Sequence, residues 1–171
     1  MDLPLILILA LGLVVALAVI GSRKGAGRDA KPPRSFPYET RGTLFSPAER
    51  SFFGVLEQAV GERYRIFGKV RLADVIKART QDKSEWRRAF NAISAKHVDF
   101  VLCDPKDTRI VAVVELDDRS HEKGERRARD DFLERALAAS GVKLLRFPAK
   151  AGYSLEEMRQ RLNGLGGGGR E

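Results

Sequence analysis

The chain has 171 residues, of which 31 are Lys or Arg and 23 are Asp or Glu, so its formal net charge at neutral pH is +8. This length suits one globular domain with extensions, and the single cysteine excludes an internal disulfide framework and a zinc site of the Cys-rich type. A basic chain of this kind favours polyanions, either nucleic acid or anionic lipid, without choosing between them.

An uncharged apolar run from Leu3 to Ile20 opens the chain. At about 1.5 Å per residue it spans roughly 27 Å, which is enough for the hydrocarbon core of a bilayer. A secretory signal peptide is the rival interpretation, but no basic region precedes the run, and Arg23 and Lys24 follow it at once. The positive-inside tendency therefore predicts a single-pass membrane anchor over residues 1–21, with its N-terminus outside and the rest of the chain in the cytoplasm.

Residues 22–43 are rich in Gly, Pro and basic side chains, and we interpret them as a linker whose positive charges lie against anionic lipid headgroups. We expect the folded domain over residues 44–165 and a flexible Gly-rich tail over residues 166–171.

The domain is expected to open with a helix. Ser46 is a good N-cap, Pro47 suits the first helical position, and Glu49 would complete a capping box. The apolar stripe of this helix consists of Phe52, Phe53, Leu56 and Val60. At 100° per residue Glu49 lies in the middle of that stripe, so either it serves only as a cap or its carboxylate also reaches an inward site.

Residues 63–70 alternate like a strand, with Arg63, Arg65 and Lys69 on one side. Residues 72–76 could extend this strand or start a helical turn, and the sequence leaves both open. A loop at Asp82 and Lys83 follows.

Ser84 is expected to cap a second helix, which carries Trp86, Phe90 and Ile93 among basic residues. An aromatic ring in such surroundings can stack on nucleic-acid bases, but at helical spacing it is more often part of a core.

The strongest functional signal lies between His97 and His121. Two alternating apolar runs are separated by a polar stretch that begins at Asp104 and favours a turn. If Asp104 pairs with Ile110, the antiparallel register places Cys103 opposite Val111, Val101 opposite Val113, and Asp99 opposite Glu115.

Side chains alternate along a strand, so this register puts Asp99, Glu115 and Asp117 on one face together with Val101, Val111 and Val113, and leaves the other face wholly apolar. Cross-strand neighbours lie roughly 5 Å apart, and carboxylates at that distance repel one another unless a cation lies among them. The hairpin therefore predicts a metal site at one end of a covered sheet, whereas a solvated acidic strand end is the plainer alternative. Cys103, within an apolar strand, is expected to be a core residue and not a nucleophile.

A charged segment then leads into a helix with Phe132, Leu133, Ala136 and Leu137, which Gly141 is expected to end. A short strand over residues 142–147 and an amphipathic helix over residues 155–162 complete the domain. This order of elements predicts an α/β fold in which helices flank a mixed β-sheet.

The acidic residues of this order resemble a known signature. Asp99 followed by Glu115-Leu-Asp117 is similar to the PD-(D/E)xK signature of restriction-endonuclease-like nucleases. The wider run D-F-V…E-L-D-D-R-S-H, then R-D-x-F-L and G-V-x-L-L-R-F, resembles the bacterial domain-of-unknown-function 2726 family. That family is itself similar to the very-short-patch-repair endonuclease branch, and its bacterial origin would make the expected membrane the bacterial inner membrane.

This resemblance implies roles for the acidic residues. Asp99 and Glu115 would hold a divalent metal, Mg²⁺ or alternatively Mn²⁺, and Glu49 matches an acidic residue that many members carry on their first helix. The signature lysine is replaced here by Asp117, which departs from the pattern and could instead join Asp99 and Glu115 in holding the metal. His121 fits the histidine that patch-repair-like members use as a general base, although a solvated turn histidine is an equal alternative.

The basic residues near the hairpin are the candidates for contacting nucleic acid. Lys96 or Lys123 could supply the cation that the missing lysine would provide. Arg129 and Arg146 match arginines of the family, and either could contact phosphate or pair with the carboxylates of the site.

The expected function is a membrane-anchored, Mg²⁺-dependent nuclease that hydrolyses phosphodiester bonds of nucleic acid, with DNA expected by analogy. Two alternatives keep the same fold. One is a catalytically inactive module that binds nucleic acid, and the other is a membrane-associated scaffold.

Overall fold

The computed structural model describes residues 35–117 and 125–165 of the chain. The chain divides into two units, residues 1–40 and residues 41–171. Of the first unit the structure describes residues 35–40, which contain neither helix nor strand. The predicted anchor and the Gly-rich tail lie outside the described residues. Among the residues that are described, no helix is long and apolar enough to cross a membrane.

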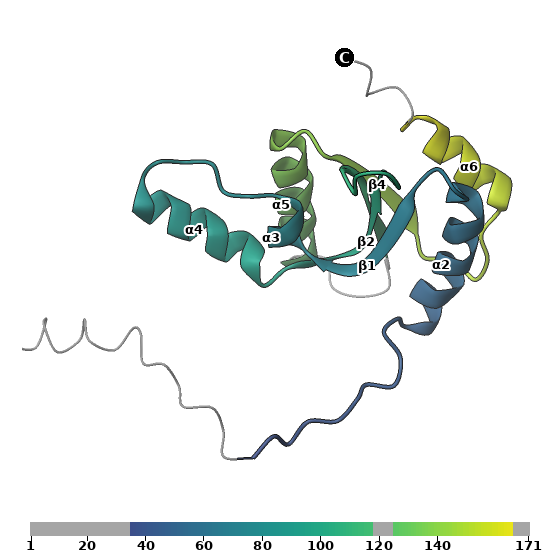
Figure 1. Cartoon of the computed structure of the whole chain (residues 1–171), viewed down its shortest axis with the longest axis horizontal. Helices are drawn as coiled ribbons and strands as arrows, with labels where there is room; N and C mark the ends of the chain where they lie inside the picture. Colours follow the sequence, from purple (N-terminus) through teal and green to yellow (C-terminus); the bar gives the residue numbers. More distant parts are fainter. Residues whose placement is uncertain (1–34, 118–124, 166–171) are drawn as a thin grey trace, which may run out of the picture. The chain divides into compact units, whose positions relative to one another are not determined.

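The second unit is an α/β domain, as the order of apolar patterns predicts (Figure 1). Its elements are α2 (Pro47–Val60), β1 (Arg65–Arg71), α3 (Leu72–Val75), α4 (Lys83–Ser94), β2 (His97–Cys103), β3 (Ile110–Asp117), α5 (Glu125–Ala139), β4 (Lys143–Pro148) and α6 (Leu155–Asn163). The four strands form one mixed sheet in the order β1-β2-β3-β4. Strand β2 is antiparallel to both β1 and β3, and β4 runs parallel to β3 after the crossover through α5.

Helices cover both faces of this sheet, and each face has its own apolar cluster. Helices α2 and α6 pack over one face, where Phe52 and Leu56 contact Phe100 and Val114 of the sheet. We call this the α2/α6 cluster. On the other face, residues of α3, α4 and α5 pack against Val101 and the strand around it, and we call this the α5 cluster. Both faces of the sheet are therefore covered, and a functional site is expected at the ends of its strands.

The first helix begins as predicted. The Ser46 hydroxyl accepts a hydrogen bond from the Glu49 backbone N–H, and the Glu49 carboxylate accepts one from the Ser46 backbone N–H at 2.9 Å. The prediction for the helix near residue 84 was wrong in its cap. Asp82 caps α4 by accepting from the Glu85 N–H at 2.6 Å, because α4 begins two residues earlier than expected. The undecided segment after β1 forms the short helix α3.

The predicted hairpin register is confirmed in its centre, where Val101 pairs with Val113. It is wrong at the turn end, because the register shifts between Leu102 and Cys103 and Cys103 pairs with Ile110 instead of Val111. As a result Val111 packs against the α2/α6 cluster, whereas Val113 belongs to the α5 cluster. The single face predicted to carry both valines therefore does not exist.

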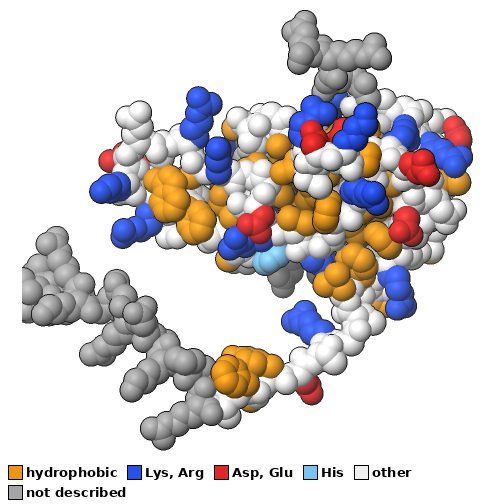
Figure 2. Space-filling model, viewed as in Figure 1, with side chains coloured by type: hydrophobic (Ala, Val, Ile, Leu, Met, Phe, Trp, Pro, Cys, Tyr) orange, Lys and Arg blue, Asp and Glu red, His pale blue; other side chains and the backbone are white. Residues whose placement is uncertain are grey.

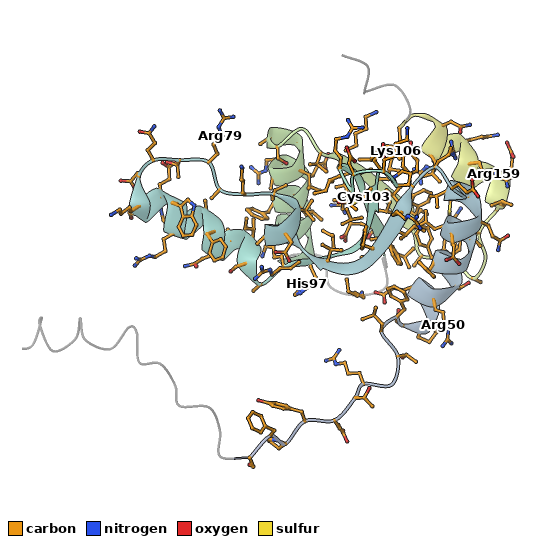
Figure 3. All side chains as sticks on the ribbon, in the orientation of Figure 1. Arg50, Arg79, His97, Cys103, Lys106 and Arg159 are labelled. Carbon is orange, nitrogen blue, oxygen red and sulfur yellow. The ribbon has the colours of Figure 1, made fainter. Side chains whose placement is uncertain are left out.

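Cys103 lies inside the domain, as expected for a core residue (Figure 3). It is only 4% exposed and packs in the α5 cluster, and its burial raises the pKa of the thiol. A buried thiol with a raised pKa is a poor nucleophile.

Gly68 lies on β1 where the ring of Phe45 comes very close. A Cβ built at Gly68 would lie 2.6 Å from Phe45 Cε1, and this ring packs against Phe53 and Phe100. We expect Gly68→Ala to destabilise the domain by about 1–3 kcal/mol, because the ring would have to leave its place in the α2/α6 cluster.

Equilibrium urea unfolding measures this change, and Gly54→Ala is the matched control. Gly54 lies in helix α2 with nothing within 4 Å of an added Cβ, so its substitution should instead stabilise the domain by about 1 kcal/mol through helix propensity. Equal stabilisation by both substitutions would contradict the close packing at Gly68.

Candidate functional site

Three charged side chains from three different elements meet at one end of the sheet. The Lys69 ammonium on β1 donates hydrogen bonds to Glu49 Oε1 on α2 and, at 3.1 Å, to Asp99 Oδ1 on β2. We call Glu49, Lys69, Asp99 and their neighbour Glu115 the carboxylate–lysine cluster. The predicted inward role of Glu49 and its capping role are both present, because one carboxylate oxygen serves the cap and the other accepts from Lys69.

A local change in strand geometry brings Lys69 into this cluster. Its backbone has φ = 55°, in the left-handed region that non-glycine residues rarely adopt. The alternation of β1 changes phase here, since Ile66 packs against the α2/α6 cluster but Val70, four residues later, packs against the α5 cluster. Such a change of phase is how an irregular strand residue re-aims its side chain.

Strand β2 changes phase beside it. Val98 and Val101 both belong to the α5 cluster, although strict alternation would place them on opposite faces. The pairs Gly68–Phe100 and Val70–Val98 flank Lys69 and Asp99, so the two irregular positions face each other across the strands. The cluster therefore lies where both strands depart from regular alternation.

Glu115 joins the cluster through backbone hydrogen bonds. The Asp99 N–H donates to Glu115 Oε1 at 3.2 Å, and the Leu116 N–H donates to Asp99 Oδ2 at 2.9 Å. The predicted proximity of Asp99 and Glu115 is thus present in the structure. Each carboxylate takes a backbone N–H of the neighbouring strand, which fixes the two side chains relative to the hairpin.

The charges of this cluster are only partly solvated. The side chain of Lys69 is 30% exposed, that of Asp99 19% and that of Glu49 17%. Burial by itself would raise the pKa of Glu49, but the hydrogen bonds from Lys69 and Ser46 outweigh it and lower that pKa. Burial would lower the pKa of Lys69, but the hydrogen bonds to Glu49 and Asp99 outweigh it and raise that pKa. Lys69 is therefore held as a cation.

These shifts predict how stability depends on pH. Because the pKa of Glu49 is lowered by folding, its stabilisation is fully present above the ordinary value of 4.5 and is lost as the pH falls through the folded pKa. Because the pKa of Lys69 is raised, its stabilisation is present below the ordinary value of 10.5 and is lost as the pH rises through the folded pKa.

We expect Glu49→Gln to lower the free energy of unfolding by about 1–2 kcal/mol near neutral pH and to flatten the acid limb of the stability profile. The amide of the new glutamine can still complete the capping box. The decrease in the free energy of unfolding therefore measures the ion pair between Glu49 and Lys69. Urea titrations across pH measure both effects. Glu57→Gln, an exposed position on the same helix, is the control, and an unchanged acid limb in Glu49→Gln would contradict the assignment.

The other predicted site residues lie as follows. Asp117 ends β3, and Arg146 of β4 is the parallel register partner of Glu115. Lys96 Nζ lies 5.4 Å from the centre of the Phe132 ring, outside the contacts of the cluster. Arg129 falls within α5, but its side chain is not among those described, and His121 and Lys123 lie outside the described residues.

Sequence reasoning did not identify Lys69 as a site residue. It was expected on one side of its strand with Arg63 and Arg65, and nothing in the pattern separates it from them. What distinguishes Lys69 from them is its left-handed backbone conformation. The sequence does not predict this conformation, because lysine has no preference for positive φ.

The donors of the cluster decide which metal it could hold. Among the described residues, no group of three His, Cys, Asp or Glu side chains is arranged to hold a metal ion. A closed site of the zinc or calcium kind therefore does not fit. The neighbouring carboxylates of Asp99 and Glu115 do fit Mg²⁺, which is usually bound through one or two carboxylates and completes its shell with water and substrate oxygens.

Comparison with known proteins gives one match. A family model described as "Protein of unknown function (DUF2726)" matches residues 41–165, which are the α/β domain. No curated protein and no solved structure matches the chain.

Proposed function

The chain belongs to the DUF2726 family, described as proteins of unknown function, and we propose that its domain is a divalent-metal-dependent nuclease that hydrolyses phosphodiester bonds. The substrate would be nucleic acid, with DNA as the first candidate. One observation carries the proposal. The Lys69 ammonium lies between the carboxylates of Glu49 and Asp99, and the Glu115 carboxylate accepts a hydrogen bond from the Asp99 backbone N–H. Two carboxylates and a lysine are the charged groups that PD-(D/E)xK nucleases use.

Asp99 and Glu115 are the residues that would hold Mg²⁺ or Mn²⁺, and Glu49 would complete the acidic set. When bound, the metal polarises the phosphate and lowers the pKa of a water molecule. The hydrogen bonds from the Asp99 and Leu116 N–H groups hold the two carboxylates in place before substrate arrives. Preorganised charge of this kind is where most catalysis of phosphoryl transfer originates.

Lys69 would act as a fixed positive charge and not as a base, because its pKa is raised. Water oxygen attacks phosphorus, the bond from phosphorus to the leaving oxygen breaks, and negative charge builds on the remaining phosphate oxygens. An ammonium beside them stabilises that charge. The proton of the attacking water needs another acceptor, and His121, four residues after Asp117, remains our candidate for this general base.

We further propose that the domain belongs to the PD-(D/E)xK superfamily with its lysine moved to another strand. Asp117 stands where the signature lysine would be, and Lys69 on β1 would supply the charge from the opposite side of Asp99. The four-stranded mixed sheet with helices on both faces supports this placement.

One observation favours a second candidate, an inactive module on the same fold that binds nucleic acid or serves as a scaffold. Lys69 already neutralises part of the charge of Glu49 and Asp99, so the cluster is stabilised without any metal. In either case we retain the proposed bacterial inner-membrane anchor over Leu3 to Ile20, which would hold the domain on the cytoplasmic side beside anionic headgroups.

The test is a titration of the full-length chain in mild detergent with Mg²⁺ and Mn²⁺ by calorimetry. It is paired with a cleavage assay on mixed DNA and RNA with and without chelator. The nuclease proposal expects metal binding and metal-dependent cleavage. Binding of nucleic acid with neither metal binding nor cleavage would favour the inactive module and overturn the nuclease.

A further inference from the structure

Helix α4 carries an apolar stripe that the domain covers only in part. Trp86, Phe90 and Ile93 follow one another at helical spacing, so they lie along one side of the helix. Ile93 is buried in the α5 cluster, Phe90 is half-buried, and Trp86 is 43% exposed. The expectation that Trp86 is a core residue was therefore wrong, because the stripe continues beyond the edge of the domain.

The two outer rings of this stripe stack on each other. The rings of Trp86 and Phe90 stack with centroids 5.0 Å apart and planes only 5° from parallel. Figure 2 shows hydrophobic side chains gathered over α4 with Lys and Arg side chains around them. Trp86 is the more exposed of the two rings, so it is the ring that a ligand on this side of the helix would contact.

The segment that carries these rings is strongly basic. Between Lys77 and His97 the chain has six Lys or Arg residues and two acidic ones. Both acidic side chains are engaged within the segment, because Asp82 caps the helix and Glu85 accepts a hydrogen bond from Thr80 at 2.6 Å. Lys83 and Arg87 make no ion pair with any side chain that the structure describes, and at 100° per residue they flank the stripe on one side.

We propose that α4 is a binding surface for single-stranded nucleic acid, on which a base stacks against Trp86 while Lys83 and Arg87 contact the adjoining phosphates. Stacking on an aromatic ring needs an unpaired base, because the faces of paired bases are covered within a duplex. This inference rests on the proposed nuclease function and gives that site a substrate class.

The chemistry of the surface fits a nucleic-acid strand better than a lipid layer. A helix that lies in a membrane interface buries a long apolar face into the acyl region. On α4 the large exposed apolar side chains are Trp86 and part of Phe90, and apart from the small side chains of Ala89 and Ala92 the rest of the exposed helix is charged or polar. One ring beside two cations matches the alternation of base and phosphate along a strand.

Helix α4 leads along the chain into the strand that carries Asp99. The helix ends at Ser94 and β2 begins at His97, two residues before Asp99. In Figure 1, α4 extends away from the sheet on the side of α3.

Trp86 is the only tryptophan of the chain, so its fluorescence reports this surface directly. We would titrate the full-length chain in mild detergent with a short oligothymidylate and, separately, with a duplex of the same length. The expected result is quenching by the single strand and much weaker quenching by the duplex. Trp86→Ala should weaken single-strand binding, followed by anisotropy of a labelled oligonucleotide, about 5- to 150-fold.

Matched variants separate stacking and charge from general effects. Arg87→Glu should make the dependence of affinity on salt less steep, reducing the magnitude of the slope of log affinity against log salt by about 1 or more. Arg159→Glu on α6 should change affinity far less (Figure 3). Phe36→Ala removes an aromatic that is 72% exposed outside the domain and should leave binding unchanged.

Several outcomes would overturn the inference. They are unchanged affinity in Trp86→Ala, equal quenching by duplex, quenching only by vesicles of anionic phosphatidylglycerol, or quenching that follows protein concentration alone. The last two would assign the surface to lipid or to a second copy of the chain. If Trp86→Ala still cleaves with unchanged strand preference, α4 is not the single-strand binding surface and the nuclease proposal is unaffected. If the single strand quenches Trp86 but no cleavage occurs, the binding surface is supported and the nuclease proposal is overturned.

Discussion

Replacing Asp99 with asparagine should lower the rate of metal-dependent cleavage at least about 10³-fold. Asp99 is one of the two carboxylates proposed to hold the metal, whose charge stabilisation is worth several kcal/mol, and each 1.36 kcal/mol is a factor of ten in rate. The amide oxygen can still accept the hydrogen bond from the Leu116 N–H, so the hairpin should stay folded. A chelator-sensitive assay under single-turnover conditions measures the loss.

The matched control is Asp104→Asn, in the turn of the same hairpin. Asp104 accepts from the Lys106 N–H at 2.8 Å and lies 3.6 Å from the Arg109 guanidinium, away from the cluster. This variant should cleave at the rate of the original protein. If Asp99→Asn keeps its rate while calorimetry still detects metal, the metal is held elsewhere and the assignment of Asp99 fails.

Replacing Lys69 with methionine should lower the rate about 10²- to 10³-fold and raise the affinity for Mg²⁺. The rate falls because one preorganised positive charge is lost from the site. Metal affinity rises because Glu49 and Asp99 are no longer neutralised by the ammonium that bonds to both. The opposite directions of the two effects distinguish a role in catalysis from a merely structural one.

Two further variants complete the measurement. Lys69→Arg keeps the charge and should recover part of the rate, whereas Lys106→Met, an exposed lysine of the hairpin turn, should change neither rate nor metal affinity. Weaker metal binding in Lys69→Met would mean that the lysine supports the carboxylates instead of competing for them, and the proposed role would be wrong.

Much of the fold was accessible from the sequence because its local signals agree with its tertiary structure. The capping box at Ser46 and Glu49 specifies where α2 begins. Alternation in β2 and β3 specifies a hairpin, and the register expected from a pairing of Asp104 with Ile110 is correct in the centre, although Ile110 itself pairs with Cys103. The proximity of Asp99 and Glu115 follows from that register, so the sequence predicts that these two residues of the candidate site lie together.

What the sequence could not supply are the irregularities. The register shift after Leu102 moves Val111 to the other cluster, and no residue type marks it. The phase changes at Lys69 and Asp99 depend on how β1 and β2 fit between two covering layers, which is a tertiary effect. Trp86 was misassigned for a related reason, since helical spacing gives the side on which a residue lies but not how far the domain extends beneath it.

The place of Lys69 in the sheet has a consequence for local stability. Among the strands of residues 35–117 and 125–165, β1 lies at the edge of the sheet and pairs with β2, while Asp99 and Glu115 lie on the two central strands. Edge strands open at lower free energy than the central strands of the same sheet, and their amide hydrogens therefore exchange faster. Fraying of β1 would therefore withdraw the positive charge and leave the carboxylates in place. The charge balance of the cluster is thus coupled to a sub-global opening of the sheet, and any ligand that neutralises those carboxylates in place of Lys69 lowers the cost of that opening.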